Sequence, residues 1–363
     1  MSEHVFNNSK DIGIIGKESV RDMIEINNLE RTFKVLNRKA GLKGAFLDLF
    51  SRDYKYVKAV NDISITIRDG EIVGYVGPNG AGKSTTIKMM TGVLKPTAGS
   101  ILIDGEDPYV NRRAHMKQIG VVFGQRSQLW WSLPVQESFR VLKDMYEVPD
   151  DVYEKNLRLF ESLVNIKELY AKPVRQLSLG QRMLCEVTAA FLHDPKIVFL
   201  DEPTIGLDVS VKDSIRTLIK KLNEEKGTTI VLTSHDTKDI ETLCERVIII
   251  DKGTLIFDDK ISKLKEMFGR FRTIKLQLTQ DSMSYEEIKD YVFAHYSKKQ
   301  VVISKEEDAE WADLVVNEEQ IDFKEVLAQI MRDLKVEDVR MEDVGVEEVI
   351  KRIYEGEERG ETD

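Results

Sequence analysis

The feature that most constrains the fold is a glycine-rich segment that directly follows an apolar run. Residues 77–84 have the sequence Gly-Pro-Asn-Gly-Ala-Gly-Lys-Ser, and the run before them, Ile72–Val76, is typical of a buried strand. Glycines allow positive φ angles and close approach to an anion, so successive N–H groups of this loop can point at phosphate oxygens. A helix predicted over Lys83–Thr91 would add the positive end of its dipole. The pattern therefore predicts a strand, a phosphate-binding loop and a helix, rather than an ordinary turn.

Two side chains of this segment have a specific role in nucleotide binding. Lys83 supplies a positive charge for the β- and γ-phosphates, and the Ser84 hydroxyl is a ligand for Mg²⁺. The residues expected to hold the phosphates are Gly77, Pro78, Asn79, Gly80, Ala81, Gly82, Lys83, Ser84 and Thr85.

A second apolar run ends in two acidic residues. Ile197–Leu200 is short and wholly apolar, as in a parallel strand buried on both faces, and Asp201 and Glu202 follow it. Ligands bind at the carboxyl ends of such strands. Asp201 is predicted to complete the Mg²⁺ site with Ser84, and Glu202 to polarise the water that attacks the γ-phosphate. The alternative is a pair of solvated surface acids before a turn.

Two further motifs surround this acidic pair. Leu177-Ser178-Leu179-Gly180-Gln181 stands before it, and Ser234-His235 follows another apolar strand, Thr229–Thr233. In this order the motifs resemble the ATP-binding subunit of ABC transporters, over roughly residues 24–260. The resemblance implies an α/β fold with a P-loop NTPase core: a mostly parallel sheet, an antiparallel β subdomain and a helical subdomain. It also implies that the chain binds ATP with Mg²⁺ and hydrolyses the ATP.

The resemblance assigns roles to three more residues. Gln125, in Val-Val-Phe-Gly-Gln, becomes the lid glutamine that contacts Mg²⁺ and senses a transmembrane partner. Asp208, in Gly-Leu-Asp, becomes the acid that links two ATP sites. His235 becomes the switch histidine at the γ-phosphate, and its place at the end of an apolar strand agrees with that role. Without motif context, the remaining histidines are expected to be surface or packing residues: His4, His115, His193 and His295.

The same resemblance makes Ser178, Gly180 and Gln181 the signature motif. They begin a helix predicted to run to about His193, so their N–H groups and the helix dipole can receive a γ-phosphate. In the family this segment faces the phosphate loop of a second copy, which implies a homodimer with ATP sandwiched between subunits. Leu179 stands where most members have a second glycine, so its side chain must point away from the nucleotide.

Adenine needs an aromatic platform, and three rings compete for that role. Phe33 ends the predicted strand Ile24–Phe33 and has the matching family position, whereas Tyr54 and Tyr56 precede the predicted strand Ala59–Ile67. We favour Phe33 slightly.

Between these strands lies an insertion, residues 34–58, that is basic, with seven Lys/Arg against two Asp/Glu. Apolar residues at helical spacing predict a short amphipathic helix: Leu42, Ala45, Phe46, Leu49 and Phe50. Such a helix could contact a membrane surface or a partner protein, and a solvated loop remains an equal alternative. Further on, Leu129-Trp130-Trp131 lies where family members touch the transmembrane subunit.

Length and composition limit the possibilities. The 363 residues suggest two domains, and no apolar stretch approaches the ~18 residues of a membrane helix, so the pore must belong to another polypeptide. Residues 1–21 have no apolar core of a signal peptide, and two cysteines without motif spacing, Cys185 and Cys244, favour a reduced cytosolic chain. We expect a tail (1–22), an ATPase domain (23–268, with a helical subdomain at about 126–194), an accessory domain (269–355) and a disordered end (356–363).

The accessory domain is expected to be acidic and small. Residues 305–363 contain 21 Asp/Glu against 8 Lys/Arg, which disfavours a nucleic-acid partner. Strands are predicted at Thr273–Leu278, Val301–Ser304, Leu314–Val316 and Val336–Met341, and helices at Tyr285–Tyr296, Phe323–Leu334 and about Val346–Tyr354. The order indicates an α+β domain of ferredoxin-like type.

The leading hypothesis is therefore an ATPase that dimerises on Mg²⁺ and ATP at the cytoplasmic face of a membrane and powers a separate permease, as in ABC-2-type exporters. The alternative is a soluble ABC ATPase that acts in translation or DNA maintenance. The gap of about fifty residues between Gln125 and Ser178 matches a transporter's helical subdomain rather than long coiled coil. A structural homologue without turnover is disfavoured because Glu202 and His235 are both present.

Overall fold

A central six-stranded sheet organises the first part of the chain. The computed structural model describes residues 21–36, 54–124, 126–268, 271–278, 283–305, 310–343 and 349–350. The strand order is β5-β6-β7-β3-β8-β9, with neighbours parallel except for β8 and β9. The strands are β3 (Ile72–Val76), β5 (Ile119–Phe123), β6 (Ile197–Asp201), β7 (Thr229–Thr233), β8 (Arg246–Asp251) and β9 (Thr254–Lys260). The predicted mostly parallel sheet is confirmed.

Both faces of this sheet are covered, which explains its short apolar strands. In β6, Val198 and Leu200 belong to the buried cluster that includes the helices on one side, while Ile197 and Phe199 belong to the cluster on the other side. All four side chains are at most 1% exposed. A strand buried in this way has room for polar residues only at its ends, and β6 accordingly ends in Asp201.

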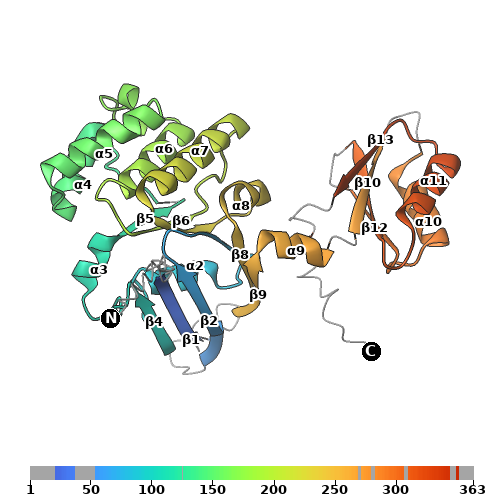
Figure 1. The fold of residues 1–363 in the computed structure, drawn as a ribbon, viewed down its shortest axis with the longest axis horizontal. Helices are drawn as coiled ribbons and strands as arrows, with labels where there is room; N and C mark the ends of the chain where they lie inside the picture. The colour runs from blue at the N-terminus through green and yellow to red at the C-terminus, as the bar shows by residue number, and fades with distance from the viewer. Residues whose placement is uncertain are drawn as a thin grey trace, which may run out of the picture.

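Helices form one of the two covering layers. Figure 1 shows α4, α5, α6 and α7 above the central sheet and β1, β2 and β4 below it. The predicted helical subdomain contains α4 (Val135–Tyr146), α5 (Asp150–Leu163), α6 (Leu179–Ala190) and two 3₁₀ turns, Lys167–Leu169 and Val174–Gln176. The other helices here are α2 (Lys83–Met90), α3 (Arg112–Gln118), α7 (Val209–Lys226), α8 (Thr237–Leu243) and α9 (Ile261–Phe268).

The antiparallel layer is a three-stranded sheet in the order β2-β1-β4. β1 (Asp22–Leu36) and β2 (Tyr54–Arg68) form a longer pair than the sequence predicts, and β4 is Ala98–Ile103. The ladder continues through Lys34 opposite Tyr56 to Leu36 opposite Tyr54, so both ends of the expected insertion are strand. Backbone hydrogen bonds extend β1 and β2 at this end although the side chains are not buried: Tyr56 is 66% exposed. The predicted amphipathic helix lies outside the described residues.

The accessory region forms a separate four-stranded antiparallel sheet, ordered β11-β12-β10-β13. Its elements are β10 (Phe271–Gln277), α10 (Tyr285–His295), β11 (Val301–Ser304), β12 (Trp311–Asn317), α11 (Phe323–Asp333) and β13 (Val339–Asp343). This is the βαββαβ order of a ferredoxin-like fold, as predicted. On one face, Ile274 and Leu314 pack with α10 and α11 in an apolar core. Val349 and Ile350, the described part of the predicted last helix, are buried in a cluster that includes Val315.

Among the helices that the structure describes, none combines the length and the hydrophobicity that crossing a bilayer requires.

Helix α6 packs closely on the sheet where it crosses β5. A Cβ atom at Gly120 would lie 2.2 Å from the carbonyl oxygen of Ala190, so the backbones can meet only because Gly120 has no side chain. At Gly74, in β3 of the same sheet, an added Cβ would meet side chains rather than backbone, Ile240 at 3.1 Å and Cys244 Sγ at 3.5 Å.

We expect Gly120→Ala to lower the free energy of unfolding by about 1–3 kcal/mol, because α6 must move away from β5. Urea unfolding followed by circular dichroism measures the effect, with Gly74→Ala as the matched control that should cost less. Equal midpoints for the wild type and Gly120→Ala would contradict this account of the α6 packing.

Candidate functional site

The loop from β3 to α2 is shaped by its contacts with neighbouring backbone. A Cβ atom at Gly77 would lie 2.5 Å from the Ile250 carbonyl oxygen, and one at Gly82 would lie 2.4 Å from the Ala59 carbonyl oxygen. Gly82 also has a φ of 107° as the residue before α2. Side chains cannot be accommodated at either position. Two of the glycines predicted for phosphate binding, Gly77 and Gly82, are thus also required by the packing of the loop itself.

Lys83 is buried inside this loop. Its side chain is 7% exposed, and Nζ donates hydrogen bonds to the carbonyl oxygens of Gly77 at 2.5 Å and Pro78 at 3.2 Å. Burial lowers the pKa of Lys83, and the nearby carboxylates of Glu202 and Asp201 oppose that shift. The buried Lys83 ammonium has lost most of its hydration. An anion bound at the loop, such as a nucleotide phosphate, would stabilise its charge.

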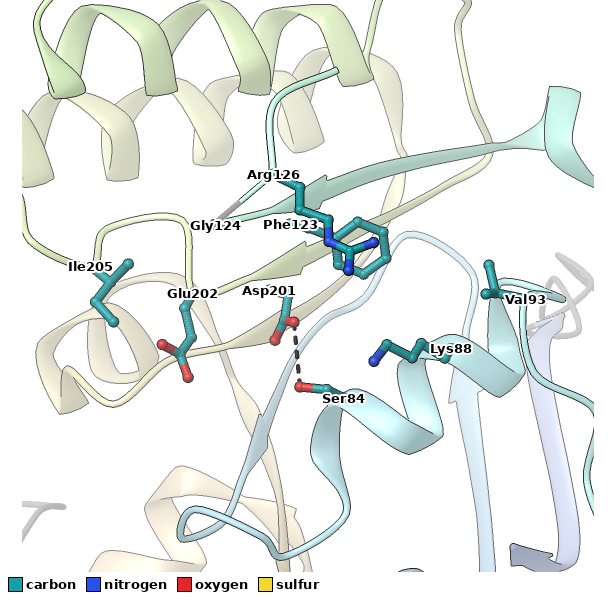
Figure 2. A pocket seen from close by; sticks show the side chains of 9 residues that line it. All are labelled: Ser84, Lys88, Val93, Phe123, Gly124, Arg126, Asp201, Glu202 and Ile205. Atoms are coloured by element: carbon teal, nitrogen blue, oxygen red, sulfur yellow. Dashed lines mark hydrogen bonds between the residues drawn. The ribbon is translucent and has the colours of Figure 1, made fainter. Parts of the chain in front are cut away.

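Ser84 and Asp201 come together from α2 and β6 (Figure 2). Ser84 Oγ lies 3.4 Å from Asp201 Oδ2, and the other oxygen, Oδ1, accepts a hydrogen bond from Thr233 Oγ1 at 2.7 Å. Thr233 therefore fixes the carboxylate so that one oxygen faces the serine. These are hard oxygen donors, which suit Mg²⁺. In the described part of the chain, no group of three or more His, Cys, Asp or Glu could hold a metal, so an ion here needs phosphate and water oxygens as well.

Glu202 turns away from Asp201 towards the end of β7. Its φ of 55° is unusual for a non-glycine residue, and its N–H donates to the Thr233 carbonyl at 3.0 Å. Figure 2 shows the Asp201 carboxylate facing Ser84, and the Glu202 carboxylate apart from this pair. His235 Nε2 lies 2.9 Å from Glu202 Oε1. The structure thus brings together the two residues for which the sequence predicts roles at the γ-phosphate.

Glu202 lines two pockets: His235 lines one of them as well, and the other, of about 430 Å³, is shown from close by in Figure 2. Ser84, Asp201 and Glu202 line it, and so do two basic residues that sequence reasoning missed, Lys88 and Arg126. Lys88 is one helical turn after Ser84, a spacing that could have indicated it. The size and the mixed charges suit a phosphate-bearing ligand.

A buried ion-pair network lies behind this site and was also missed. Asp239, at the start of α8, is fully buried, and its Oδ1 accepts from Arg216 Nε at 2.6 Å. The other oxygen, Oδ2, accepts from Ser234 Oγ at 2.6 Å and from the Thr204 hydroxyl. Ser234 precedes His235, so one carboxylate fixes the segments after both Glu202 and β7. The only sequence signal was a pair of charged residues on apolar helix faces.

The signature residues lie elsewhere. Ser178 is exposed and caps α6: its Oγ accepts from Gln181 N at 3.2 Å, and Gln181 Oε1 accepts from Ser178 N at 3.1 Å. Gly180 is buried against α7, where a Cβ would lie 2.5 Å from Val211 Cγ1. Asp208, the residue before α7, is exposed and makes no side-chain cap. Among the described residues around the Ser84 pocket, none of these four is a lining residue.

Other predictions stay open or are consistent with the structure. Gln125 lies outside the described residues. The Arg31 guanidinium lies 4.8 Å from the centre of the Phe33 ring, and the Lys34 ammonium lies 3.9 Å from that of Tyr54, so the adenine platform stays a prediction. His115 and His193 are packing residues: each Nε2 contacts a backbone carbonyl, and burial lowers both pKa values, that of His193 to about 4. Cys185 and Cys244 are free and buried.

We expect Lys83→Met to weaken ATP binding by roughly 10–100-fold, because a hydrogen bond from a charged group contributes about 1.5–3 kcal/mol. Fluorescence titration with an ATP analogue measures the affinity. Lys263→Met is the matched control and should bind normally, since Lys263 of α9 forms an exposed pair with Asp259 of β9. Unchanged affinity in Lys83→Met would exclude this loop as the phosphate site.

Comparison with known sequences places the chain among transport ATPases. The family model described as ABC transporter matches residues 60–205. The ABC transporter ATP-binding protein NatA of Bacillus subtilis is 34% identical over 60% of this chain and 88% of its own length. The bacitracin transport ATP-binding protein BcrA of Bacillus licheniformis is 32% identical over 61% and 72%, respectively. The methionine import ATP-binding protein MetN of Geobacillus kaustophilus is 33% identical over 55% and 59%.

Other matches are larger proteins or solved structures. The chain covers 26% and 28% of two ABC transporter A family members of Dictyostelium discoideum, 32% and 33% identical to it, and thus about a quarter of their length. A dimeric structure of an ATP-binding cassette after hydrolysis, bound to ADP and Pi, has 27% identity and a TM-score of 0.54, covering 66% of this chain and 99% of that one. The cbiO1 structure from Clostridium perfringens, part of a transporter complex, has 25% identity and a TM-score of 0.54, covering 77% and 97%.

Proposed function

Because this chain belongs to the ABC transporter family of ATP-binding proteins, we propose that it hydrolyses ATP as a homodimer and thereby powers a separate membrane permease of the ABC-2 exporter type. The observation that carries the proposal is the pairing of Glu202 with His235 at 2.9 Å beside the Ser84–Asp201 oxygens. A carboxylate and an imidazole at this place equip the site for hydrolysis as well as for binding. The chain would then work at the cytoplasmic face of the membrane, held there by the permease.

The residues of the site have different roles in ATP hydrolysis. The backbone N–H groups of the Gly77 loop and the Lys83 ammonium would bind the β- and γ-phosphates. Ser84 Oγ and Asp201 Oδ2 would hold Mg²⁺, which neutralises phosphate charge when it is bound. Glu202 would orient the attacking water and accept its proton, and the Nε2–H group of His235 would donate a hydrogen bond to the Glu202 carboxylate or to the γ-phosphate. Phosphoryl transfer needs this positioning and charge more than covalent chemistry.

We infer a second copy because Ser178 and Asp208 face solvent rather than the Ser84 pocket. Ser178 is exposed at the N-terminal end of α6, and Asp208 is exposed before α7, while the Ser84 pocket is lined without them. A phosphate bound to one copy could therefore accept hydrogen bonds from the helix end of the other. Leu179 is 41% exposed, so its side chain can lie beside a nucleotide rather than between the nucleotide and the helix. The dimeric neighbour bound to ADP and Pi supports this arrangement.

Two features support a membrane partner. Trp130 and Trp131 are 37% and 57% exposed, which is costly in water unless a protein covers them. BcrA is named for bacitracin transport and MetN for methionine import, so the relatives by name include transport proteins. The basic insertion and the accessory domain favour export.

We expect Glu202→Gln to bind ATP normally and to lose turnover by about 100-fold or more, because a positioned general base contributes roughly 10²–10⁴-fold. The trapped ATP should also hold two copies together, so size-exclusion chromatography with light scattering should find a dimer. Phosphate release and a nucleotide titration measure the other two properties.

Glu154→Gln, in an exposed pair with Arg158 on α5, is the matched control for Glu202→Gln. It should leave turnover at the wild-type level. Wild-type turnover in Glu202→Gln itself would exclude Glu202 as the base, and a strictly monomeric protein at saturating ATP would exclude the sandwich.

The proposal predicts that a hydrophobic membrane protein is encoded beside this chain in its genome. Co-expressed with it and extracted in detergent, the wild-type chain should co-purify, whereas Trp131→Ala should be lost from the complex and still bind ATP. The soluble alternative, an ATPase of translation or DNA maintenance, predicts instead that the wild-type chain leaves the membrane fraction and sediments with ribosomes or DNA.

A further inference from the structure

Glu186 is a buried carboxylate in the signature helix that the hydrolysis site does not use. It lies in α6, two helical turns after Ser178, and is 4% exposed. Within the described residues, no lysine or arginine forms an ion pair with it. A buried charge is costly unless hydrogen bonds compensate for its lost hydration. Burial accordingly raises the pKa of Glu186, and hydrogen bonds from one nearby loop, followed by the charge of Arg182, oppose that shift.

That loop begins at the pocket and ends at the exposed tryptophans. Ser127 Oγ donates to Glu186 Oε1, and Gln128 N donates to Oε2 at 3.1 Å. Gln128 Nε2 donates in turn to the backbone carbonyl of Glu186 at 3.0 Å. Three hydrogen bonds therefore join two consecutive loop residues to one residue of α6. Their donors are all neutral groups of the loop, so the carboxylate depends on the loop for its solvation.

The loop runs from the Ser84 pocket to the exposed tryptophans, which are the proposed sites of ATP and of the membrane partner. At the start, Gly124 N donates to the Asp201 carbonyl at 2.9 Å, and Arg126 lines the pocket. At the end, Trp131 is exposed and lies 5.9 Å from the guanidinium of Arg182, one turn after Ser178 in α6. Residues 126–131 are thus fixed to α6 at Arg182 and, more firmly, at Glu186.

We propose that Glu186 is a positioning residue for ATP hydrolysis: it ties residues 127–129 to α6, so that a displacement of Trp130 and Trp131 displaces the helix end that carries Ser178. The proposal rests on the proposed function, because it assumes that Ser178 contributes to turnover. The loop and α6 move together only if the hydrogen bonds between them persist against thermal motion. Hydrogen bonds to an ionised acceptor such as the Glu186 carboxylate are about twice as strong as those between neutral groups. A partner protein on the tryptophans would then set the position of the signature end through Glu186.

The test is a graded series of variants with intact ATP binding. Glu186→Leu removes every bond to the carboxylate at similar volume, Glu186→Gln keeps an acceptor without the charge, and Ser127→Ala removes one donor. The matched control is Thr188→Val, since Thr188 is buried in the same helix but bonds only to the Leu184 carbonyl of α6. We expect unchanged ATP affinity throughout, turnover lowered about tenfold or more in Glu186→Leu (about 1.4 kcal/mol) and less in the other two. Thr188→Val should behave as the wild type.

A spectroscopic readout separates positioning from general stability. In a Trp311→Phe background, Trp130 and Trp131 are the only tryptophans, and Glu202→Gln prevents turnover. Saturating ATP should change their emission, and the change should be lost in Glu186→Leu, smaller in Glu186→Gln and retained in Thr188→Val. The double variant Ser127→Ala with Glu186→Leu should be no worse than Glu186→Leu alone, because both remove the same tie.

Each outcome decides the proposal. Wild-type turnover and emission change in both Glu186→Gln and Ser127→Ala would overturn it, and these two variants carry the test if Glu186→Leu does not fold. Equal losses in Thr188→Val would also overturn it, because they would show a general effect of loosening α6. If the wild-type protein lacks turnover but its ATP-induced emission change still depends on Glu186, the tie stands and the proposed function fails.

Discussion

The structure depends on the burial of the central strands on both faces. β3, β6 and β7 have no solvated side, so their residues are apolar throughout and polar groups are confined to the strand ends. Because these strands are parallel, their carboxyl ends meet at one edge. The phosphate loop, Asp201 with Glu202, and His235 all follow this edge. The hydrophobic requirement of the sheet thus brings the reactive residues to one edge, where Ser84 contacts Asp201 and Glu202 contacts His235.

Close backbone contact is the second constraint, and it gives the glycines a role in packing as well as in phosphate binding. Gly77 and Gly82 were predicted because a phosphate needs N–H groups at short range, yet carbonyl oxygens of Ile250 and Ala59 already leave no room for a Cβ there. Gly180 likewise serves the packing of α6 on α7. A loop held this tightly presents its N–H groups in a fixed arrangement before a ligand arrives, so less binding energy is spent on ordering it.

Sequence patterns predicted the strands that an apolar run defines locally. They missed the strand extensions and pocket residues that depend on contacts with distant parts of the chain. β7 and β11 have the predicted bounds because an apolar run between polar ends defines a strand by itself. The strand extensions to Leu36 and from Tyr54 gave no such signal, since their stability comes from a partner strand and not from burial. Arg126 was also missed, because only the folded chain shows that it borders the Ser84 pocket.

Asp239 and Glu186 show why buried charges could not be inferred from the sequence and what they contribute. A carboxylate on an apolar helix face is unfavourable alone, and its partners lie 23 residues away for Arg216 and 58 for Gln128. Apolar residues of the same size would often stabilise such sites as well or better, so stability is a weak reason for keeping the charge. Directional hydrogen bonds, in contrast, specify one relative placement of two segments. Asp239 does this for the segments that carry Glu202 and His235, and Glu186 does it for the signature helix and the tryptophan loop.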